Sequence, residues 1–139
     1  MLINIINIMP PNTFVSFTCS KIVFDQRGKK VFKSLPPGWQ KITRDTMEKF
    51  NKENHKIKCV ITGRKSGITV IDCDTQEAYD DVVATYETLK EAYTVKSPRG
   101  FHIYVAYEKY AKTSTNNDLN IDIRNDGGFI VAPPSVCSD

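Results

Sequence analysis

Two carboxylates stand two residues apart in the segment ITVIDCDTQEAYDD, at residues 68–81. Successive side chains of a strand point to opposite faces, so Asp72 and Asp74 share one face. Two strand residues span about 7 Å, which lets both carboxylates converge on one divalent cation or on two neighbouring ones. Without a cation the two charges would repel each other. The pair therefore predicts a metal site at the end of a buried strand.

An ordinary structural role is the alternative for this pair. Asp74 would then be the N-cap of the following helix, with Glu77 completing a capping box, and Asp72 would be a solvated strand end. Capping aspartates are commoner than catalytic ones, so further functional side chains are needed to favour the metal site.

Two later segments supply such side chains. In NIDIR the alternation places Asn120, Asp122 and Arg124 on one face, so that a third carboxylate lies in an otherwise apolar strand. In SPRGFHIYV, His102 follows a turn that offers backbone N–H groups and a cation. Three carboxylates and a histidine without cysteine ligands suit Mg²⁺ or Mn²⁺ rather than zinc. A nucleoside triphosphate is the substrate that such a site predicts.

The elements that must position these residues follow from periodicity. Apolar residues at steps of three or four predict an amphipathic helix from Thr75 to Tyr93, whose Val82, Tyr86 and Leu89 should pack on the sheet face opposite the acids. We expect GRKSG to join two strands as a hairpin, NDGG to join LNIDIR to FIVAP in the same way, and EKYAKTSTNND to form a polar loop. The order is a βαβ unit followed by antiparallel hairpins.

Composition narrows the class of protein. A chain of 139 residues with 40% apolar content predicts one compact domain. The formal charge of +3 permits a polyanionic partner. Four cysteines without a CxxC pair favour a reduced, intracellular protein, in the cytoplasm or a host-cell replication compartment. The apolar opening MLINIINIM is too short to cross a bilayer and is expected to be a strand, so no membrane partner is predicted.

The order of VIDCD, SPRGFHIYV and IDIRNDGGFIVAPPS resembles the three motifs of the archaeo-eukaryotic primase superfamily. Within it the chain is most similar to the bifunctional primase-polymerase domains of plasmids and large DNA viruses, over roughly residues 36–136. The resemblance implies an α+β fold with an RRM-like mixed or antiparallel sheet, packed helices and a small N-terminal α/β part. We expect one catalytic domain over 1–139, with an N-terminal part at 1–57 and a motif-bearing core at 58–136. The resemblance also implies a fragment of a longer replication protein, with a helicase region or partner beyond the C-terminus.

The resemblance assigns roles residue by residue. Asp72 and Asp74 match the first-motif metal ligands, His102 the second-motif nucleotide contact and Asp122 the third-motif metal ligand, with Gly100 at the small position of the second motif. The implied activity is that of a DNA primase and polymerase, which uses two Mg²⁺ or Mn²⁺ ions to join NTPs or dNTPs on a single-stranded DNA template.

Basic residues around the motifs complete the hypothesis. Candidates for triphosphate binding beside His102 are Arg99, Ser97, Lys96 and Arg124. For Arg124 a salt bridge to Asp122 is an even alternative. Candidates for template contact are Arg64, Lys65 and Trp39, although Trp39 also suits a core position. A metal-dependent nuclease and a catalytically inactive RRM-like nucleic-acid-binding module remain as alternative functions.

Overall fold

The structure is a computed structural model in which residues 14–135 are described; the strand expected in residues 1–9 lies outside this range. The described chain forms two compact units. One unit contains residues Thr62–Gly128, and the other combines Phe14–Ile61 with the chain from Phe129 onward. Among the described residues, the first of these units is one continuous stretch of sequence, which is inserted in sequence between the two pieces of the second.

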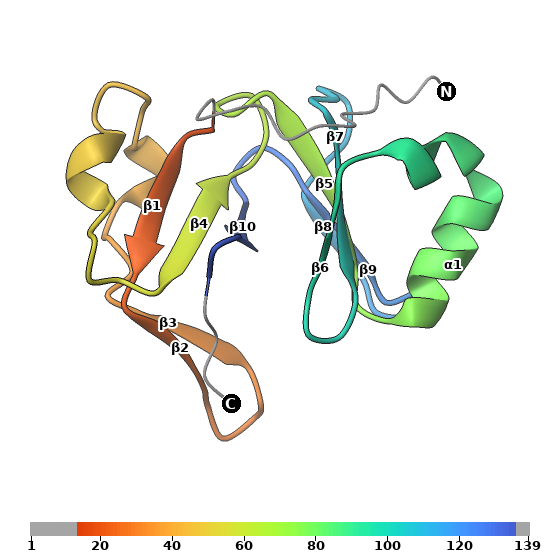
Figure 1. Cartoon of the computed structure of the whole chain (residues 1–139), viewed down its shortest axis with the longest axis horizontal. Coiled ribbons are helices and arrows are strands. Elements are labelled where there is room, and N and C mark those ends of the chain that lie inside the picture. Colours follow the sequence, from red (N-terminus) through yellow and green to blue (C-terminus); the bar gives the residue numbers. More distant parts are fainter. Residues whose placement is uncertain (1–13, 136–139) are drawn as a thin grey trace. The chain divides into compact units, whose positions relative to one another are not determined.

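A five-stranded sheet forms the unit of residues 62–128, with the strand order β6-β7-β5-β9-β8 (Figure 1). Every neighbouring pair in this sheet is antiparallel. The strands are β5 (Ile68–Cys73), β6 (Thr94–Lys96), β7 (Phe101–Ala106), β8 (Ser114–Asn116) and β9 (Ile121–Arg124). The strand β5, which carries the first acidic pair, therefore lies at the centre of the sheet.

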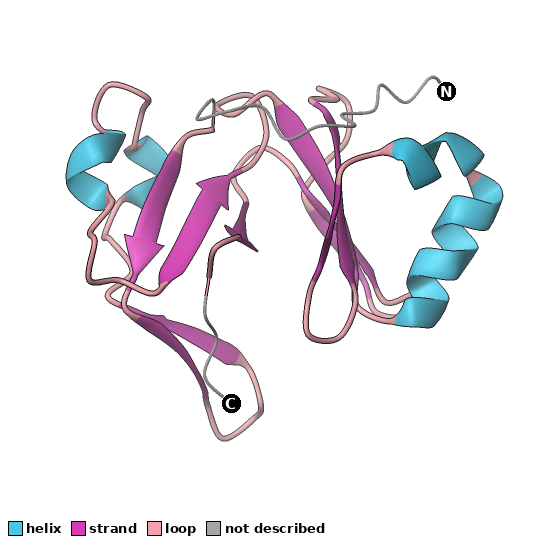
Figure 2. Ribbon diagram, viewed as in Figure 1, coloured by secondary structure: helices cyan, strands magenta, loops and turns pink. Residues whose placement is uncertain are grey.

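Helix α1 (Gln76–Thr85) follows β5 and packs on one face of this sheet (Figure 2). Its Ala78 and Val83 share an apolar cluster with Cys73, which alternates with Asp72 and Asp74, and with Ile103, which follows His102 on β7. The helix is shorter than the expected span of 75–93. It ends at Thr85, and a 3₁₀ helix at Glu87–Glu91 continues the chain.

The expected packing of three helix side chains is confirmed in two cases. Val82 packs against the cluster and Leu89 is fully buried in it, on the face opposite the acids. Tyr86 was expected there too, but 49% of its surface is exposed. The reason is that the α-helix has ended by Tyr86, whose backbone is no longer helical, so the periodicity of the stripe no longer fixes the direction of its side chain.

The other unit is built on a three-stranded antiparallel sheet in the order β1-β4-β10. Its strands are β1 (Ser16–Cys19), β4 (Ile57–Ile61) and β10 (Phe129–Ala132). A separate hairpin joins β2 (Lys21–Phe24) to β3 (Lys30–Lys33), and 3₁₀ helices lie at Trp39–Lys41 and Met47–Phe50. Phe17, Ile57 and Cys59 are fully or almost fully buried in the core of this unit.

The predictions of two hairpins from turn sequences are wrong. GRKSG lies between β4 and β5, but these strands belong to different sheets and only the single pair Gly63–Ile68 connects the two ends of the turn. NDGG lies between β9 and β10, which also belong to different sheets. Both edges of β9 are occupied by β5 and β8, so β10 cannot pair with it. The polar segment expected to be a loop contains β8, which supplies one of these edges.

Asn125 anchors the end of β9 through a buried hydrogen-bond network. Its side chain is fully buried, and its Nδ2 donates to the carbonyl oxygens of Glu108 and Ala111 at 2.8 and 2.6 Å. The hydroxyl of Thr69, on β5, donates to Asn125 Oδ1 at 2.8 Å. The segment that follows β7 is thereby held against β5 and the end of β9.

The expected α+β fold class is confirmed, with antiparallel sheets and one α-helix among the described residues. None of the helices in residues 14–135 is long and apolar enough to cross a membrane.

We expect Asn125→Ala to lower the free energy of unfolding by about 3 kcal/mol, because the buried side chain makes three hydrogen bonds of about 1 kcal/mol each. Urea unfolding followed by circular dichroism measures the change. The exposed Asn117→Ala is the matched control and should leave stability unchanged. Equal stability of the two variants would show that the network does not hold the sheet.

Candidate metal and nucleotide site

The register of three neighbouring strands brings acids and a histidine into one row. Asp72 on β5 stands opposite His102 on β7 and, on its other side, opposite Asp122 on β9. Side chains directly opposite each other in antiparallel strands point to the same face with Cβ atoms about 5 Å apart. His102, Asp72 and Asp122 therefore form a row across the centre of the sheet.

Asp74 lies just beyond the end of β5 and is exposed. Its backbone N–H donates to the carbonyl oxygen of Asn120 at 2.8 Å, which fixes the chain at this point. The capping alternative for Asp74 is wrong, because the N-cap of α1 is Thr75, whose hydroxyl accepts the N–H of Ala78 at 3.0 Å. The carboxylate of Asp74 is thus not used to begin the helix.

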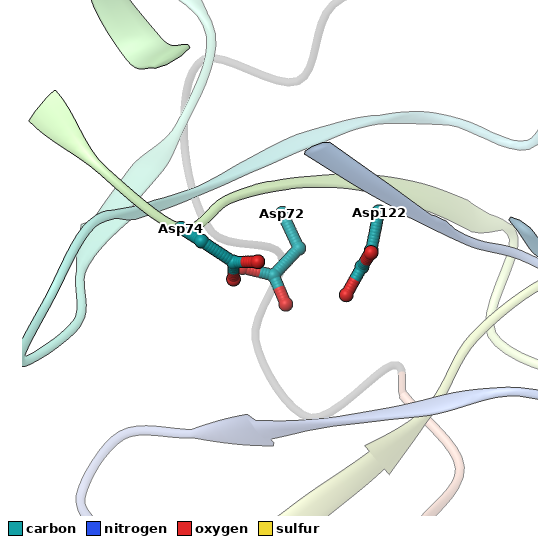
Figure 3. A group of neighbouring side chains, drawn as sticks. All are labelled: Asp72, Asp74 and Asp122. Carbon is teal, nitrogen blue, oxygen red and sulfur yellow. The ribbon is translucent and has the colours of Figure 1, made fainter. Parts of the chain in front are cut away.

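The three carboxylates gather as the strand alternation predicted. One oxygen from each of Asp72, Asp74 and Asp122 lies within 4.8 Å of the others. Figure 3 shows the three side chains extending to the same side of their strands. Oxygen atoms in such a group are the donors that hard divalent cations prefer, so the chemistry of the set fits Mg²⁺ or Mn²⁺.

His102 adds a nitrogen donor to the row. Its Nε2 lies 3.4 Å from Asp72 Oδ1, and only 12% of its side chain is exposed. Its Nδ1 is buried and has no hydrogen-bond partner within residues 14–135. A buried polar atom without a partner costs about 1–3 kcal/mol, so this nitrogen has free capacity for a group not contained in the described chain.

Arg124 partly compensates the negative charge. Its Nη2 donates to Asp122 Oδ2 at 3.0 Å and lies 4.0 Å from Asp72 Oδ2. The salt bridge expected as one alternative is therefore present, while 34% of the arginine side chain remains exposed. The cluster still holds three carboxylates against one guanidinium.

The charges and burial of the cluster alter two neighbouring groups. Desolvation and the negative charges of Asp72 and Asp122 raise the pKa of Asp74, although the cations of Arg99 and Arg124 oppose this. Burial, together with the charges of Asp72 and Asp74, raises the pKa of the Cys73 thiol to about 12. Cys73 therefore stays a neutral thiol on the packed face of the sheet.

The turn at residues 97–100 packs against the end of β5. Ser97 closes this turn, since its hydroxyl accepts the N–H of Gly100 at 3.0 Å and its N–H donates to the Gly100 carbonyl oxygen at 2.9 Å. A Cβ at Gly100 would lie 1.8 Å from the carbonyl oxygen of Cys73. Only glycine allows this approach, and the approach brings the exposed Arg99 into the electrostatic field of Asp74.

Lys96 is not brought to the acidic row. It stands opposite Phe101, which points away from His102, and its ammonium lies 5.0 Å from the centre of the Phe101 ring. This pair is on the face that carries α1, where Phe101 also contacts Tyr79. Successive side chains of a strand point to opposite faces, and Phe101 directly precedes His102. Lys96, which pairs with Phe101, therefore lies on the face opposite to His102.

The three candidates for template contact lie in different surroundings. Arg64 and Lys65 are on the turn at 63–67, where the Arg64 N–H donates to Asp126 Oδ1 at 2.8 Å and the Arg64 side chain is exposed. Trp39 is half-buried and packs against the core of the other unit, with its ring centre 4.9 Å from that of Phe129. This packing agrees with the core alternative for Trp39 more than with a free stacking platform.

The sequence patterns assigned no positioning role to three residues that hold the site in place, although Gly100 matches the small residue of the second motif. Thr75 caps the helix, Gly100 admits the turn, and Asn125 holds the end of β9. A threonine directly before a helical stripe is a capping signal in its own right. The burial of Asn125 has no comparable signal, since an asparagine before Asp-Gly indicates a solvent-exposed turn.

A model of the family "bifunctional DNA primase/polymerase, N-terminal" matches residues 24–139. The chain belongs to this family. The match contains Asp72, Asp74, His102 and Asp122 and all five strands of the sheet that carries them. No curated protein and no solved structure matches the chain.

We expect Gly100→Ala to lower the free energy of unfolding by about 1–3 kcal/mol, because the added methyl group overlaps the backbone at the end of β5. Thermal or urea unfolding measures the loss. Arg99→Ala changes the same turn without a steric overlap and should unfold like the parent chain. If Gly100→Ala were as stable as Arg99→Ala, the close approach would not constrain the site.

We also expect a specific dependence of stability on pH when no cation is bound. The pKa of Asp74 is raised above its ordinary value of 3.8, so its contribution to stability is present below pH 3.8 and is lost as pH rises through the raised pKa. Relative to Asp74→Asn, the parent should therefore lose free energy of unfolding over this interval. Urea unfolding in chelator across a pH series measures the difference.

The exposed Asp118→Asn is the control for this series, and its stability should follow that of the parent at each pH. A parent that instead became more stable than Asp74→Asn as the pH rose would contradict the unfavourable environment of Asp74.

Proposed function

We propose that this member of the primase/polymerase family is a divalent-cation-dependent nucleotidyltransferase that makes primers or extends DNA on a single-stranded DNA template. One observation carries the proposal. The carboxylates of Asp72, Asp74 and Asp122 converge within 4.8 Å beside His102, on the strands that contain the three motifs. A binding module without catalysis has no need of this costly arrangement.

The carboxylates of Asp72, Asp74 and Asp122 are the groups that would hold Mg²⁺ or Mn²⁺. When bound, the cations supply activation of a 3′-hydroxyl and neutralisation of the pyrophosphate leaving group. In the reaction the 3′-oxygen forms a bond to the α-phosphorus of an NTP or dNTP, the bond to pyrophosphate breaks, and the hydroxyl proton passes to solvent. Family membership supports this chemistry over simple hydrolysis.

Basic side chains around the row suit the triphosphate. His102 has a buried nitrogen free for a hydrogen bond, and Arg124 has a partly exposed guanidinium at the same row. Arg99 extends from the adjoining turn near Asp74. The Ser97 hydroxyl accepts a hydrogen bond within its own turn, and Lys96 lies over the Phe101 ring. We therefore propose that His102, Arg124 and Arg99 bind the triphosphate.

The proposed partners besides the nucleotide are a template strand and a helicase. The exposed Arg64, with the half-buried Lys65 beside it on the same turn, is proposed to contact the phosphates of a template strand. We propose that the activity belongs to replication in a reducing, intracellular compartment, and that a helicase region or partner works with this domain.

We expect Asp72→Asn combined with Asp74→Asn to remove catalysis while keeping the fold. The substitutions preserve size and relieve repulsion, but lose the cation ligands, which costs at least ~10³-fold in rate. Dinucleotide formation and primer extension with Mn²⁺ on labelled single-stranded DNA measure the rate. A thermal shift on adding Mn²⁺ measures cation binding separately, and the double variant should lose it.

Asp80→Asn with Asp81→Asn is the matched control, since it removes the same charge from the exposed side of α1. This control should keep both the activity and the Mn²⁺ shift. His102→Ala should keep the Mn²⁺ shift but raise the KM for the nucleotide. Shortening of the labelled strand instead of extension would favour a nuclease, and undiminished extension by the double variant would overturn the metal site.

A further inference from the structure

The hairpin of β2 and β3 presents a basic surface that the proposed reaction does not use. It belongs to the unit of the three-stranded sheet and extends beyond that sheet with its turn free (Figure 1). Only its base packs on the core, through Ile22 and Phe32. The hairpin carries five cations, all exposed, at Lys21, Arg27, Lys29, Lys30 and Lys33. None of these cations has an ion-pair partner among residues 14–135.

Two of these lysines are held together in an unfavourable arrangement. Lys21 and Lys33 stand directly opposite each other in the antiparallel pair, on the face turned away from Ile22 and Phe32. Like charges in directly opposite positions destabilise a two-stranded ribbon. An anion bound between the two ammonium groups would remove this repulsion. The pair therefore favours binding of a negatively charged partner.

The turn of the hairpin is ordered by its single acid. Asp25 Oδ1 accepts the backbone N–H groups of Arg27 and Lys29, both at 2.8 Å, and Gly28 adopts a φ of 77°. The carboxylate thus serves the backbone, and the cationic side chains of Arg27 and Lys29 stay directed to solvent. A turn that is ordered in advance loses little conformational freedom on binding.

An exposed aromatic ring lies next to the turn, on the face of the hairpin opposite to Lys21 and Lys33. Phe24 is 56% exposed although it is an apolar side chain, and it lies directly opposite Lys30 in the strand pair. Cations spaced along a ribbon suit a phosphate backbone, and an exposed ring provides a face on which an unpaired base can stack. In a duplex the bases are already stacked on each other, so the ring favours a single strand.

We propose that the β2–β3 hairpin is a binding surface for single-stranded nucleic acid. Lys21 and Lys33 on one face and the cations of the turn contact phosphates, and Phe24, beside Lys30 on the other face and next to the turn, stacks on a base. The surface adds a second contact for the template of the proposed function, on elements that carry none of the three acids. Most of β2 also precedes the residues matched by the family model, which begin at 24. Binding at the hairpin requires neither the acidic row nor a nucleotide.

The test is fluorescence anisotropy of a labelled 20-nucleotide oligo-dT titrated with the full chain, without divalent cation or nucleotide. Lys21→Gln with Lys33→Gln should weaken binding about tenfold at low salt, and should reduce the slope of log K against log salt by about 1.4, since each phosphate contact contributes about 0.7. Phe24→Ala should weaken binding about tenfold at every salt concentration, because stacking releases no counterions.

A charge reversal separates binding from folding. Lys33→Glu creates an opposite-charge pair with Lys21, so its Tm should equal or exceed that of the parent, while its affinity for oligo-dT should fall further than that of Lys33→Gln. The matched controls are Lys109→Gln with Lys112→Gln, and Tyr110→Ala, which remove two exposed lysines and an exposed ring from the other unit. Both controls should bind like the parent.

Binding at the hairpin and catalysis at the acids can fail independently of each other. Equal affinity of the hairpin variants and the parent would overturn it, as would preference for a 20-base-pair duplex or binding of anionic vesicles in place of the oligonucleotide. Asp72→Asn with Asp74→Asn should bind oligo-dT at least as tightly as the parent. Retained hairpin-dependent binding by a chain that extends no primer would support the binding surface and reject the polymerase.

Discussion

The alignment of β5 with its two neighbours is the constraint on which the candidate site depends. Asp72 faces His102 on one side and Asp122 on the other, and a shift of either neighbour by one residue would turn its functional side chain to the face that carries α1. The chain secures both alignments from outside the row. Gly100 admits a turn against the end of β5, and Asn125 fixes the end of β9. Repulsion among the acids is therefore opposed by packing and hydrogen bonds placed elsewhere in the sheet.

Features set by near neighbours in sequence could be predicted for this fold. Alternation identified β5, β7 and β9, and a spacing of three or four identified α1, because these patterns depend on local geometry. Partner choice is decided by distant residues instead. The turns GRKSG and NDGG have the composition of hairpins, yet the strands on either side of each belong to different sheets. The helix stripe likewise continued past Thr85 in the sequence but not in the structure.

The site could be predicted better than the fold around it, since parity along a strand decides which side chains share a face. Asp72, Asp74 and Asp122 were placed together by that rule, and they lie together. Lys96 is close to His102 in sequence but does not reach the acids. It pairs with Phe101, the neighbour of His102, and its side chain therefore points to the other face of the sheet. Asn125 could not be foreseen, as its burial depends on a loop that reaches it from the end of β7.

The interleaving of the two units has a consequence for the order of events on the ribosome. All five strands of the sheet with the acids lie within residues 62–128, whereas β4 must wait for β10, which is made about seventy residues later. The sheet with the acids is thus complete within one stretch of nascent chain, while β4 has one edge without its partner until the rest of the chain emerges. An unpaired edge is a site of aggregation during synthesis. Conditions that slow elongation between these strands would prolong that exposure and lower the yield of folded protein.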